Sequence, residues 1–227
     1  DFGLQGEGPT HPALLDWLAA DFVKHGWSVK HLVRRLVNTE TYRQSSSHRT
    51  DASSKDPENR LYWRAHRKRL RFEQLRDSVL AVSGNLEGRV GGRPEPFWGE
   101  KATKRRAIYG YVNRFNLDPT LRAFDFANPL QTQPKRDESI VPSQALFTLN
   151  SPFVIGEMNS LVAEESFQRL ASAEEKMEFL FHRILRRVPH PQERKKLLSI
   201  FGNGERRMDW ALAAQAMVMS NEFQYLD

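Results

Sequence analysis

The chain has 227 residues and no cysteine, and its 34 Lys and Arg against 28 Asp and Glu give a formal net charge of +6 at pH 7. Without cysteine, this segment cannot hold a disulfide framework, a thiolate metal centre, an iron–sulfur cluster, a c-type haem attachment or a thiol nucleophile. Its 39% hydrophobic content suits a globular core, and no apolar run reaches the ~18 residues of a membrane-spanning helix, so we expect no membrane span.

The N-terminal part of the sequence predicts short helices joined by polar loops. Apolar residues recur every three to four positions up to Gly26, which indicates a first helix with a glycine stop. Ser28 is a suitable N-cap for a second helix that ends near Tyr42, and the polar run 44–55 is expected to be an exposed loop. The other helices predicted here are a short one that begins at Pro57 and a stronger one over residues 70–82.

The centre of the chain is predicted to be irregular. Residues 88–99 hold several glycines and prolines, which excludes regular structure. Residues 107–112 are rich in aromatic and β-branched side chains and predict either a short strand or extended chain. Residues 116–142 are dense in Pro, Asn, Asp and Phe and predict a long irregular segment with one helical turn at 119–124. A segment of that kind is more often functional than idle.

Helices return after Pro142. The helices predicted in this part cover residues 143–149, 151–171, 172–187, 191–201 and 209–225. The predicted fold is therefore mainly α, a multi-helix bundle with one long irregular insertion. We expect an N-terminal helical lobe at 1–87, a loop-rich segment at 88–141 with the short β-like stretch, and a C-terminal helical lobe at 142–227, all within one compact domain.

A first basic cluster runs from residue 60 into the helix predicted at 70–82. It interleaves with aromatic residues, a composition that suits polyanions such as nucleic acids. At 3.6 residues per turn, however, its members point all round a helix and form no single stripe, so exposure to solvent or mutual pairing is the favoured interpretation. The cluster consists of Arg60, Arg64, Arg67, Lys68, Arg69, Arg71 and Arg76.

A second set of polar residues lies in and beside the irregular segment. Arginines and carboxylates that an irregular backbone brings together are typical of a binding site, and equally of a long loop that satisfies its own polar groups. Both interpretations stay open at this stage. The candidate site residues are Arg105, Arg106, Arg114, Asp125, Asn128 and Arg136.

The sequence contains no recognisable metal or catalytic motif. Its seven histidines include no H-E-x-x-H pair, and none lies at short ligand spacing with a third ligand nearby, so we predict no metal site. A nucleophile elbow, a phosphate-binding P-loop and a dinucleotide fingerprint are also missing. A catalytic triad can still assemble from residues that are distant in the chain.

Several strings distributed along the chain resemble one family. They are THPALLDWLA at 10–19, GWSVK at 26–30, TYRQS at 41–45, DPENRL at 56–61, YGYVNR at 109–114, FDFANP at 124–129, VPSQALFTLNSP at 141–152 and SNEF at 220–223. Together they resemble the planctomycete-type domain of unknown function fifteen-fifty-three, essentially end to end. This family carries no established activity.

The resemblance implies a setting for the chain. Such domains lie at the C-terminus of large exported bacterial proteins that commonly begin with a signal sequence and a c-type cytochrome domain. We therefore expect an extracytoplasmic location, haem elsewhere in the parent chain and no cofactor in this segment. The other domains of the parent are expected partners. The family pattern extends upstream of Asp1, and the chain begins with neither Met nor a signal peptide, so we expect a fragment that lacks the start of its domain.

Three functions remain open from the sequence. The leading hypothesis is a binding or scaffold module, which we favour over an enzyme. Its candidate residues would hold an acidic or sulfated polysaccharide or a partner domain. The second is an enzyme of hydrolase or lyase type, with Asp125 as general acid or base and Arg114 or Arg136 stabilising negative charge. The third, nucleic-acid binding through the basic helices, is the least favoured for an exported protein.

Overall fold

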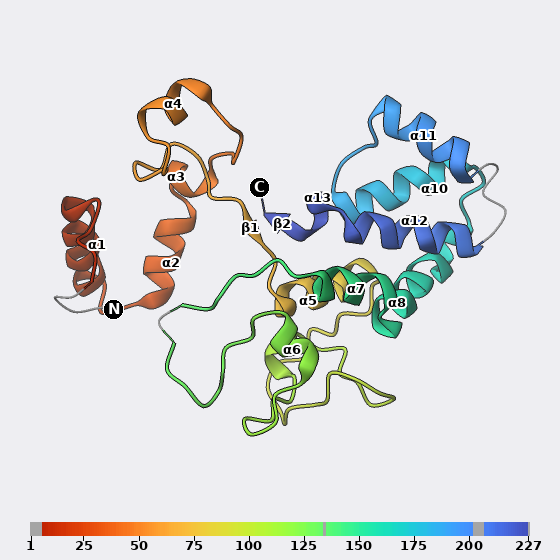
Figure 1. Cartoon of the computed structure of the whole chain (residues 1–227), viewed down its shortest axis with the longest axis horizontal. Coiled ribbons are helices and arrows are strands. Elements are labelled where there is room, and N and C mark those ends of the chain that lie inside the picture. Colours follow the sequence, from red (N-terminus) through yellow and green to blue (C-terminus); the bar gives the residue numbers. More distant parts are fainter. Residues whose placement is uncertain (1–5, 134, 202–206, 227) are drawn as a thin grey trace. The chain divides into compact units, whose positions relative to one another are not determined.

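The computed structural model describes residues 6–133, 135–201 and 207–226, and the chain is mainly α, as the sequence predicts (Figure 1). The one sheet among the described residues is a two-stranded ladder between β1 (Lys68–Arg69) and β2 (Tyr225–Leu226). The chain divides into two compact units, residues 1–68 with residue 227, and residues 69–226. The division falls between Lys68 and Arg69, whereas the sequence analysis placed a lobe boundary near residue 87.

The first unit contains helices α1 (Pro12–Lys24), α2 (Val29–Val37), α3 (Glu40–Arg43) and α4 (Thr50–Lys55). Ser28 caps α2 as predicted, because its hydroxyl accepts a hydrogen bond from the backbone N–H of His31. The predicted single helix up to Tyr42 is interrupted at Thr39, whose side chain caps α3 instead. A hydroxyl residue that satisfies the N–H groups of a new helix ends the previous one.

Two predictions in the first unit are wrong. The polar run 44–55 is not entirely loop, because its last six residues form α4. The helix expected at Pro57 is replaced by turns in which Asn59 and Tyr62 adopt left-handed backbone angles of φ 56° and 54°. The carboxylate of Asp56 accepts the backbone N–H groups of Arg60 and Leu61, which holds this part of the chain in a turn.

The second unit contains the remaining helices. They are α5 (Phe72–Val82), α6 (Pro119–Ala123), α7 (Pro142–Asn150), α8 (Pro152–Ala163), α9 (Glu165–Gln168), α10 (Ala173–Leu180), α11 (Pro191–Phe201), α12 (Arg207–Met219) and α13 (Asn221–Gln224). A wide π-type turn, Phe181–Leu185, extends α10. None of the described helices combines the length and the apolar character that crossing a membrane requires.

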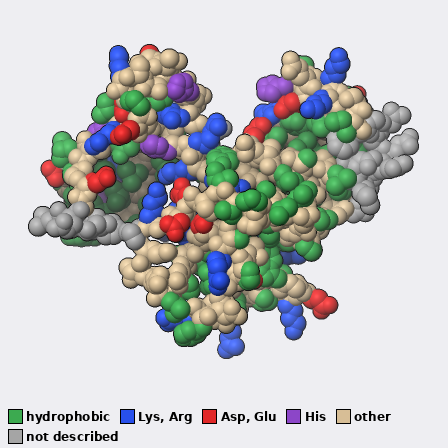
Figure 2. Space-filling model, in the orientation of Figure 1, with side chains coloured by type: hydrophobic (Ala, Val, Ile, Leu, Met, Phe, Trp, Pro, Cys, Tyr) green, Lys and Arg blue, Asp and Glu red, His purple; other side chains and the backbone are tan. Residues whose placement is uncertain are grey.

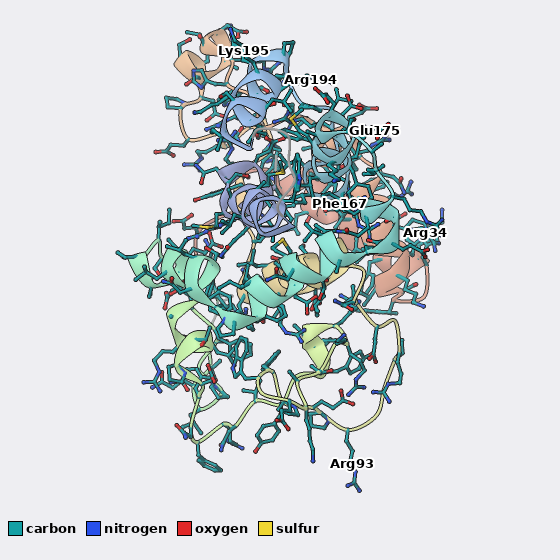
Figure 3. All side chains as sticks on the ribbon, turned by 90° about the vertical axis from the view of Figure 1, so that its right-hand side faces the viewer. Arg34, Arg93, Phe167, Glu175, Arg194 and Lys195 are labelled. Atoms are coloured by element: carbon teal, nitrogen blue, oxygen red, sulfur yellow. The ribbon has the colours of Figure 1, made fainter. Side chains whose placement is uncertain are left out.

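The larger apolar core of the second unit forms where α12 packs along α8. Small residues on α12, among them Ala213 and Ala214, let the two helices approach closely. Phe167 on α9 is buried in this core (Figure 3). Its ring contacts the ring of Trp210 edge-on, with centroids 6.1 Å apart. This core makes the C-terminal helices one packed body.

A second, aromatic core anchors the irregular segment to α5. Phe72 on α5 meets the rings of Phe97, Trp98 and Phe124 at centroid distances of 5.6 to 5.8 Å. Phe147 on α7 packs against both cores and so joins them. The long irregular segment is therefore fixed by its own aromatic side chains and does not hang free of the helices.

The β-like stretch 107–112 is not a strand. Its first part forms a 3₁₀ turn, η1 (Ala107–Tyr109), and Gly110 makes only an isolated bridge with Glu95. The N–H of Ala107 donates to the carboxylate of Asp77 at 2.7 Å. The composition alone did not decide the backbone here. Ala107 is buried, whereas Ile108 and Tyr111 are exposed, and β-propensity measures the fit to a half-buried surface more than a backbone preference.

Candidate functional site

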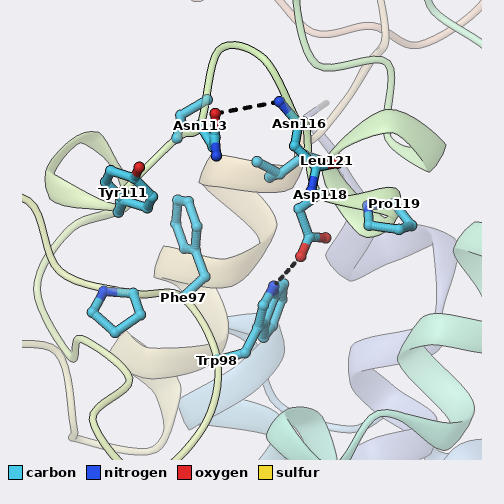
Figure 4. Close-up of a pocket in the computed structure, with 10 residues that line it drawn as sticks. Phe97, Trp98, Tyr111, Asn113, Asn116, Asp118, Pro119 and Leu121 are labelled. Atoms are coloured by element: carbon cyan, nitrogen blue, oxygen red, sulfur yellow. Dashed lines mark hydrogen bonds between the residues drawn. The ribbon is translucent and has the colours of Figure 1, made fainter.

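The irregular segment encloses an open hollow of about 270 Å³ (Figure 4). Aromatic, amide and carboxylate side chains share its wall. The lining consists of Pro96, Phe97, Trp98, Tyr111, Val112, Asn113, Asn116, Asp118, Pro119 and Leu121. All of these residues belong to the second unit.

The aromatic wall of the hollow is held rigidly. Phe97 is 4% exposed, and its ring lies 5.4 Å from the guanidinium carbon of the buried Arg76. A side chain at Gly110 would overlap the Phe97 ring, so the close approach of the two segments requires glycine there. Backbone and ring positions in this wall are therefore set before any ligand arrives.

Asp118 orients the indole of Trp98. Its Oδ2 accepts the Trp98 Nε1–H at 3.0 Å (Figure 4). Its Oδ1 caps α6 by accepting the N–H of Thr120 at 2.7 Å. The carboxylate also lies at the positive end of a helical turn, where a negative charge is stabilised. Asp118 is thus a positioning residue, and Trp98 presents a fixed aromatic face.

The rim of the hollow offers hydrogen-bonding groups. The Asn113 Oδ1 accepts the N–H groups of Phe115 and Asn116, which fixes the turn and leaves the Asn113 amide –NH₂ as a donor (Figure 4). Within the described part of the chain, neither this –NH₂ group nor the hydroxyl of the exposed Tyr111 has a hydrogen-bond partner. Aromatic faces beside a few convergent polar groups are typical of a small-molecule binding site.

The buried arginine among the candidates is committed to the loop itself. Arg105 is 1% exposed and donates to the backbone carbonyls of Gly91 and Arg93, and it pairs with Glu95 at 3.1 Å. The side chain of Arg93, in contrast, extends outward from the edge of the unit (Figure 3). Arg106 is 69% exposed and lies 3.9 Å from Asp77. Arg105 is therefore a loop-fixing residue.

Arg136 and Asp125 line a second, smaller hollow of about 40 Å³. Arg136 donates two hydrogen bonds to Glu73, at 2.7 and 3.0 Å, and lies over the ring of Phe126. Burial raises the pKa of Glu73, but the hydrogen bonds from Arg136 and from a backbone N–H outweigh it, and the net pKa is lowered. The Asp125 carboxylate accepts the Ser139 N–H at 2.7 Å and its hydroxyl at 2.9 Å.

Neither Asn128 nor Arg114 is among the residues that line this smaller hollow. The Asn128 side chain accepts the N–H of Leu130 at 3.0 Å, as expected of a turn residue. Arg114 is exposed, follows the lining residue Asn113 directly, and has its guanidinium 5.3 Å from the centre of the Phe115 ring. It forms no ion pair with any described residue. Of the six candidates, Arg114 is the one that directly follows, in sequence, a residue lining the larger hollow.

A family model described as protein of unknown function (DUF1553), PSD1, matches residues 1–201. The chain belongs to this family. The resemblance drawn from the sequence strings is thus confirmed. No curated protein and no solved structure matches this DUF1553 chain.

The basic surface of the DUF1553 chain forms no continuous patch on the face drawn in Figure 2, where the Lys and Arg side chains of the described residues are scattered. In the first basic cluster, Arg76 is buried and Arg69 donates to the side-chain oxygens of Gln144 and Gln224. The sequence analysis favoured exposure to solvent or mutual pairing. Arg76 does pair with the neighbouring Asp77, at 3.5 Å, whereas Arg69 binds side chains of distant helices.

The sequence analysis missed the aromatic wall of the hollow. Phe97 and Trp98 lie in the glycine- and proline-rich stretch, which was treated only as a loop. The sequence did contain a signal for this wall, namely two adjacent aromatic residues in a stretch rich in glycine and proline. Large aromatic side chains are usually buried, so the pair indicates packing where an exposed linker was expected. The polar lining residues, in contrast, lie where the sequence indicated a functional segment. Asn116 and Asp118 belong to the irregular segment, and Asn113 lies just before it.

Proposed function

We propose that this DUF1553 domain is a binding module that holds one ring-sized unit of an acidic or sulfated polysaccharide in the hollow at Trp98 and Tyr111. The observation that carries the proposal is the lining itself, with rigid aromatic faces beside amide and hydroxyl groups. A sugar ring has one apolar face that packs on an aromatic ring and hydroxyls that bond amides and carboxylates.

The size of the hollow supports a small ligand. Its 270 Å³ lies just below the ~300–1,000 Å³ of sites for drug-sized molecules, so it suits one sugar ring with the rest of the polymer outside. The fixed indole of Trp98 adds affinity, because a side chain that is already ordered loses little entropy on binding.

Exposed cations near the hollow support an anionic ligand. Arg114 follows a lining residue, and Arg122 is exposed on α6, whose residues Pro119 and Leu121 line the hollow. Neither arginine forms an ion pair with a described residue. A guanidinium binds sulfate or carboxylate through two parallel hydrogen bonds.

The arrangement of carboxylates favours binding over hydrolysis. Glycosidases use two carboxyl groups across the scissile bond. The hollow is lined by one carboxylate, Asp118, and both of its oxygens already accept hydrogen bonds. Asp125, the candidate acid or base from the sequence, is engaged by Ser139.

The wider setting of the module is proposed on the sequence resemblance. We place it in an exported bacterial protein with a c-type cytochrome domain elsewhere in the chain. The module would then hold polysaccharide, or a neighbouring domain, close to the part of the parent protein that carries the haem.

The test is binding of sulfated, carboxylated and neutral polysaccharides to the chain, measured by array and by titration calorimetry. We expect binding of anionic glycans, with an affinity roughly 30-fold lower for Trp98→Ala, since an anchoring aromatic contributes about 2 kcal/mol or more. Arg114→Ala should lower both the affinity and its salt dependence. Trp27→Ala is the matched control, because Trp27 is exposed and lies in the first unit. Equal binding by wild type and Trp98→Ala would overturn the proposal.

A further inference from the structure

Three potential metal ligands meet in the first unit, away from the hollow. Asp21 lies in the last turn of α1, His25 follows that helix, and His31 lies in the first turn of α2. One ligand atom from each lies within 4.8 Å of the others. The His31 Nε2 is 2.9 Å from the Asp21 Oδ2. The His25 Nδ1 is 3.3 Å from the Asp21 Oδ1 and 2.8 Å from the backbone carbonyl oxygen of Asp21.

The turn between the two helices brings the ligands together. Asp21 and His25 are four residues apart, so a helical backbone places them on one face. Gly26 and Trp27 both have positive φ, 64° and 58°, which reverses the chain within two residues. His31 then enters the same space from α2, so the third ligand comes from the neighbouring helix. This is why the search by spacing predicted no metal site.

The carboxylate of Asp21 is prepared for a cation. Asp21 is 7% exposed, and the Arg35 guanidinium donates to its Oδ1 at 3.1 Å. That hydrogen bond fixes the orientation of the Asp21 carboxylate. Arg35 is itself held over the ring of Trp17, at 5.0 Å. An outer partner that fixes the orientation of a ligand is characteristic of metal sites.

The two imidazoles are arranged as a pair with access to solvent. Their rings stack with centroids 3.8 Å apart and an interplanar angle of 13°. His25 is 38% exposed and His31 is 29% exposed, so an ion can reach them from the surface.

We propose that Asp21, His25 and His31 form a site for a divalent transition metal and that Zn²⁺ is the preferred ion. Two imidazoles and one carboxylate are a ligand set that zinc accepts, with a fourth position open to water. The nitrogens and the oxygen would close to about 2.0–2.2 Å from the ion. The alternative is a metal-free polar network of the same residues with Arg35, and the experiment below separates the two.

The composition of the first unit gives the ion a role. Among its described residues, the buried ones are Asp21, Ser46 and Asn59, all of them polar. A unit without a buried apolar cluster gains little from the hydrophobic effect and is the kind of small structure that a metal stabilises. The bound ion would join α1 to α2 at their shared corner.

The test uses the full chain without a polyhistidine tag. Equilibrium dialysis against Zn²⁺ at pH 7.5 should give one tightly bound ion per chain. We expect Asp21→Asn, His25→Ala and His31→Ala each to lower the Zn²⁺ affinity by at least about 10-fold. Losing a residue that only hydrogen-bonds to a ligand already lowers metal affinity by about 10-fold or more, and losing a ligand should cost at least as much. His48→Ala is the matched control, since His48 lies in the same unit outside the cluster, against Trp63.

Circular dichroism of each metal-free variant checks that the helices remain. If one variant loses helicity, Arg35→Met tests the site in its place, because it removes only the outer partner and should keep the 1:1 stoichiometry. Replacement of Zn²⁺ by Co²⁺ should give visible absorption bands that His25→Ala and His31→Ala lose. Wild-type binding no tighter than that of the ligand variants would overturn the proposal and establish the metal-free network.

Discussion

At the scale of single residues, two buried arginines hold the irregular segment in place. Arg76 on α5 is 2% exposed, and its guanidinium donates to the backbone carbonyls of Thr103 and Arg105. Arg105 in turn donates to the carbonyls of Gly91 and Arg93. A long segment without regular structure must satisfy its backbone carbonyls in some other way, and here arginine side chains do so.

We predict that Arg105→Leu lowers the free energy of unfolding by about 1–3 kcal/mol, because it removes the hydrogen bonds to the Gly91 and Arg93 carbonyls, which contribute about 0.5–1.5 kcal/mol each. The neighbouring Arg106 is 69% exposed and is the matched control, so Arg106→Leu should stay within about 0.5 kcal/mol of wild type. Urea unfolding followed by circular dichroism measures both. Equal effects of the two substitutions would show that Arg105 does not hold the loop.

The same residues show how far sequence can resolve a site. Arg105, Arg106 and Arg114 are alike in charge and in local composition, and only tertiary packing makes the first buried and leaves the other two exposed. The turn-forming Asn113 was within reach of sequence reasoning. The role of Asp118 was not, because its partner Trp98 lies 20 residues away in the chain.

At the scale of elements, helix starts were predicted better than helix lengths. Proline at the first turn of α7 and α8 and the capping box of Ser172 at α10 are local signals, and each of these helices begins within a residue of its predicted start. Interruptions were missed at Thr39 and Ser220, where a hydroxyl side chain caps a following short helix. Continuous apolar periodicity conceals such a break, because the next short helix resumes the same pattern.

One ion-pair triad joins elements of the second unit. Arg187 donates to Glu193 on α11 at 2.7 and 2.8 Å, and to Glu222 on α13 at 2.6 and 2.8 Å. Its guanidinium also lies 5.1 Å from the centre of the Phe181 ring. Each carboxylate thus receives a paired hydrogen bond, the geometry in which an arginine ion pair is most specific.

We predict that this triad makes the second unit less stable as the pH falls below about 4.5. The hydrogen bonds of Arg187 lower the pKa of Glu193 from its ordinary 4.5 to about 2. A carboxylate whose pKa falls on folding stabilises the protein fully above its unfolded pKa, so this contribution is present above about pH 4.5 and is lost as the pH falls toward 2. Urea unfolding between pH 6 and pH 2.5 should give a flatter pH dependence for Glu193→Gln than for wild type.

The control for the triad is Glu165→Gln. Glu165 is 77% exposed, and its partner Arg169 lies one helical turn away on the surface. An exposed pair of this kind contributes little, so this substitution should leave the acid dependence as in wild type. If Glu193→Gln and wild type lose stability in parallel as the pH falls, the triad does not contribute in the way described.

At the scale of the whole molecule, the two units differ in what stabilises them. Both apolar clusters belong to residues 69–226, while the buried residues described in the first unit are polar. The sequence predicted α5 correctly but grouped it with the N-terminal helices and placed the boundary near residue 87, because α5 looks like one more N-terminal helix. Its side chains Phe72, Val79 and Val82 are buried in the two clusters of the second unit, and only tertiary contacts could reveal that.

We therefore predict that residues 69–227 fold without residues 1–68. This fragment keeps the aromatic hollow and both apolar clusters, so it should melt in one cooperative transition and bind anionic glycans with the affinity of the full chain. It lacks Asp21, His25 and His31, so it should bind no Zn²⁺ tightly. Thermal melts followed by circular dichroism, together with the two binding titrations, check each part. A fragment that melts without a transition would show that residues 1–68 are needed for the core, and glycan binding lost from a well-folded fragment would place the ligand site outside the hollow.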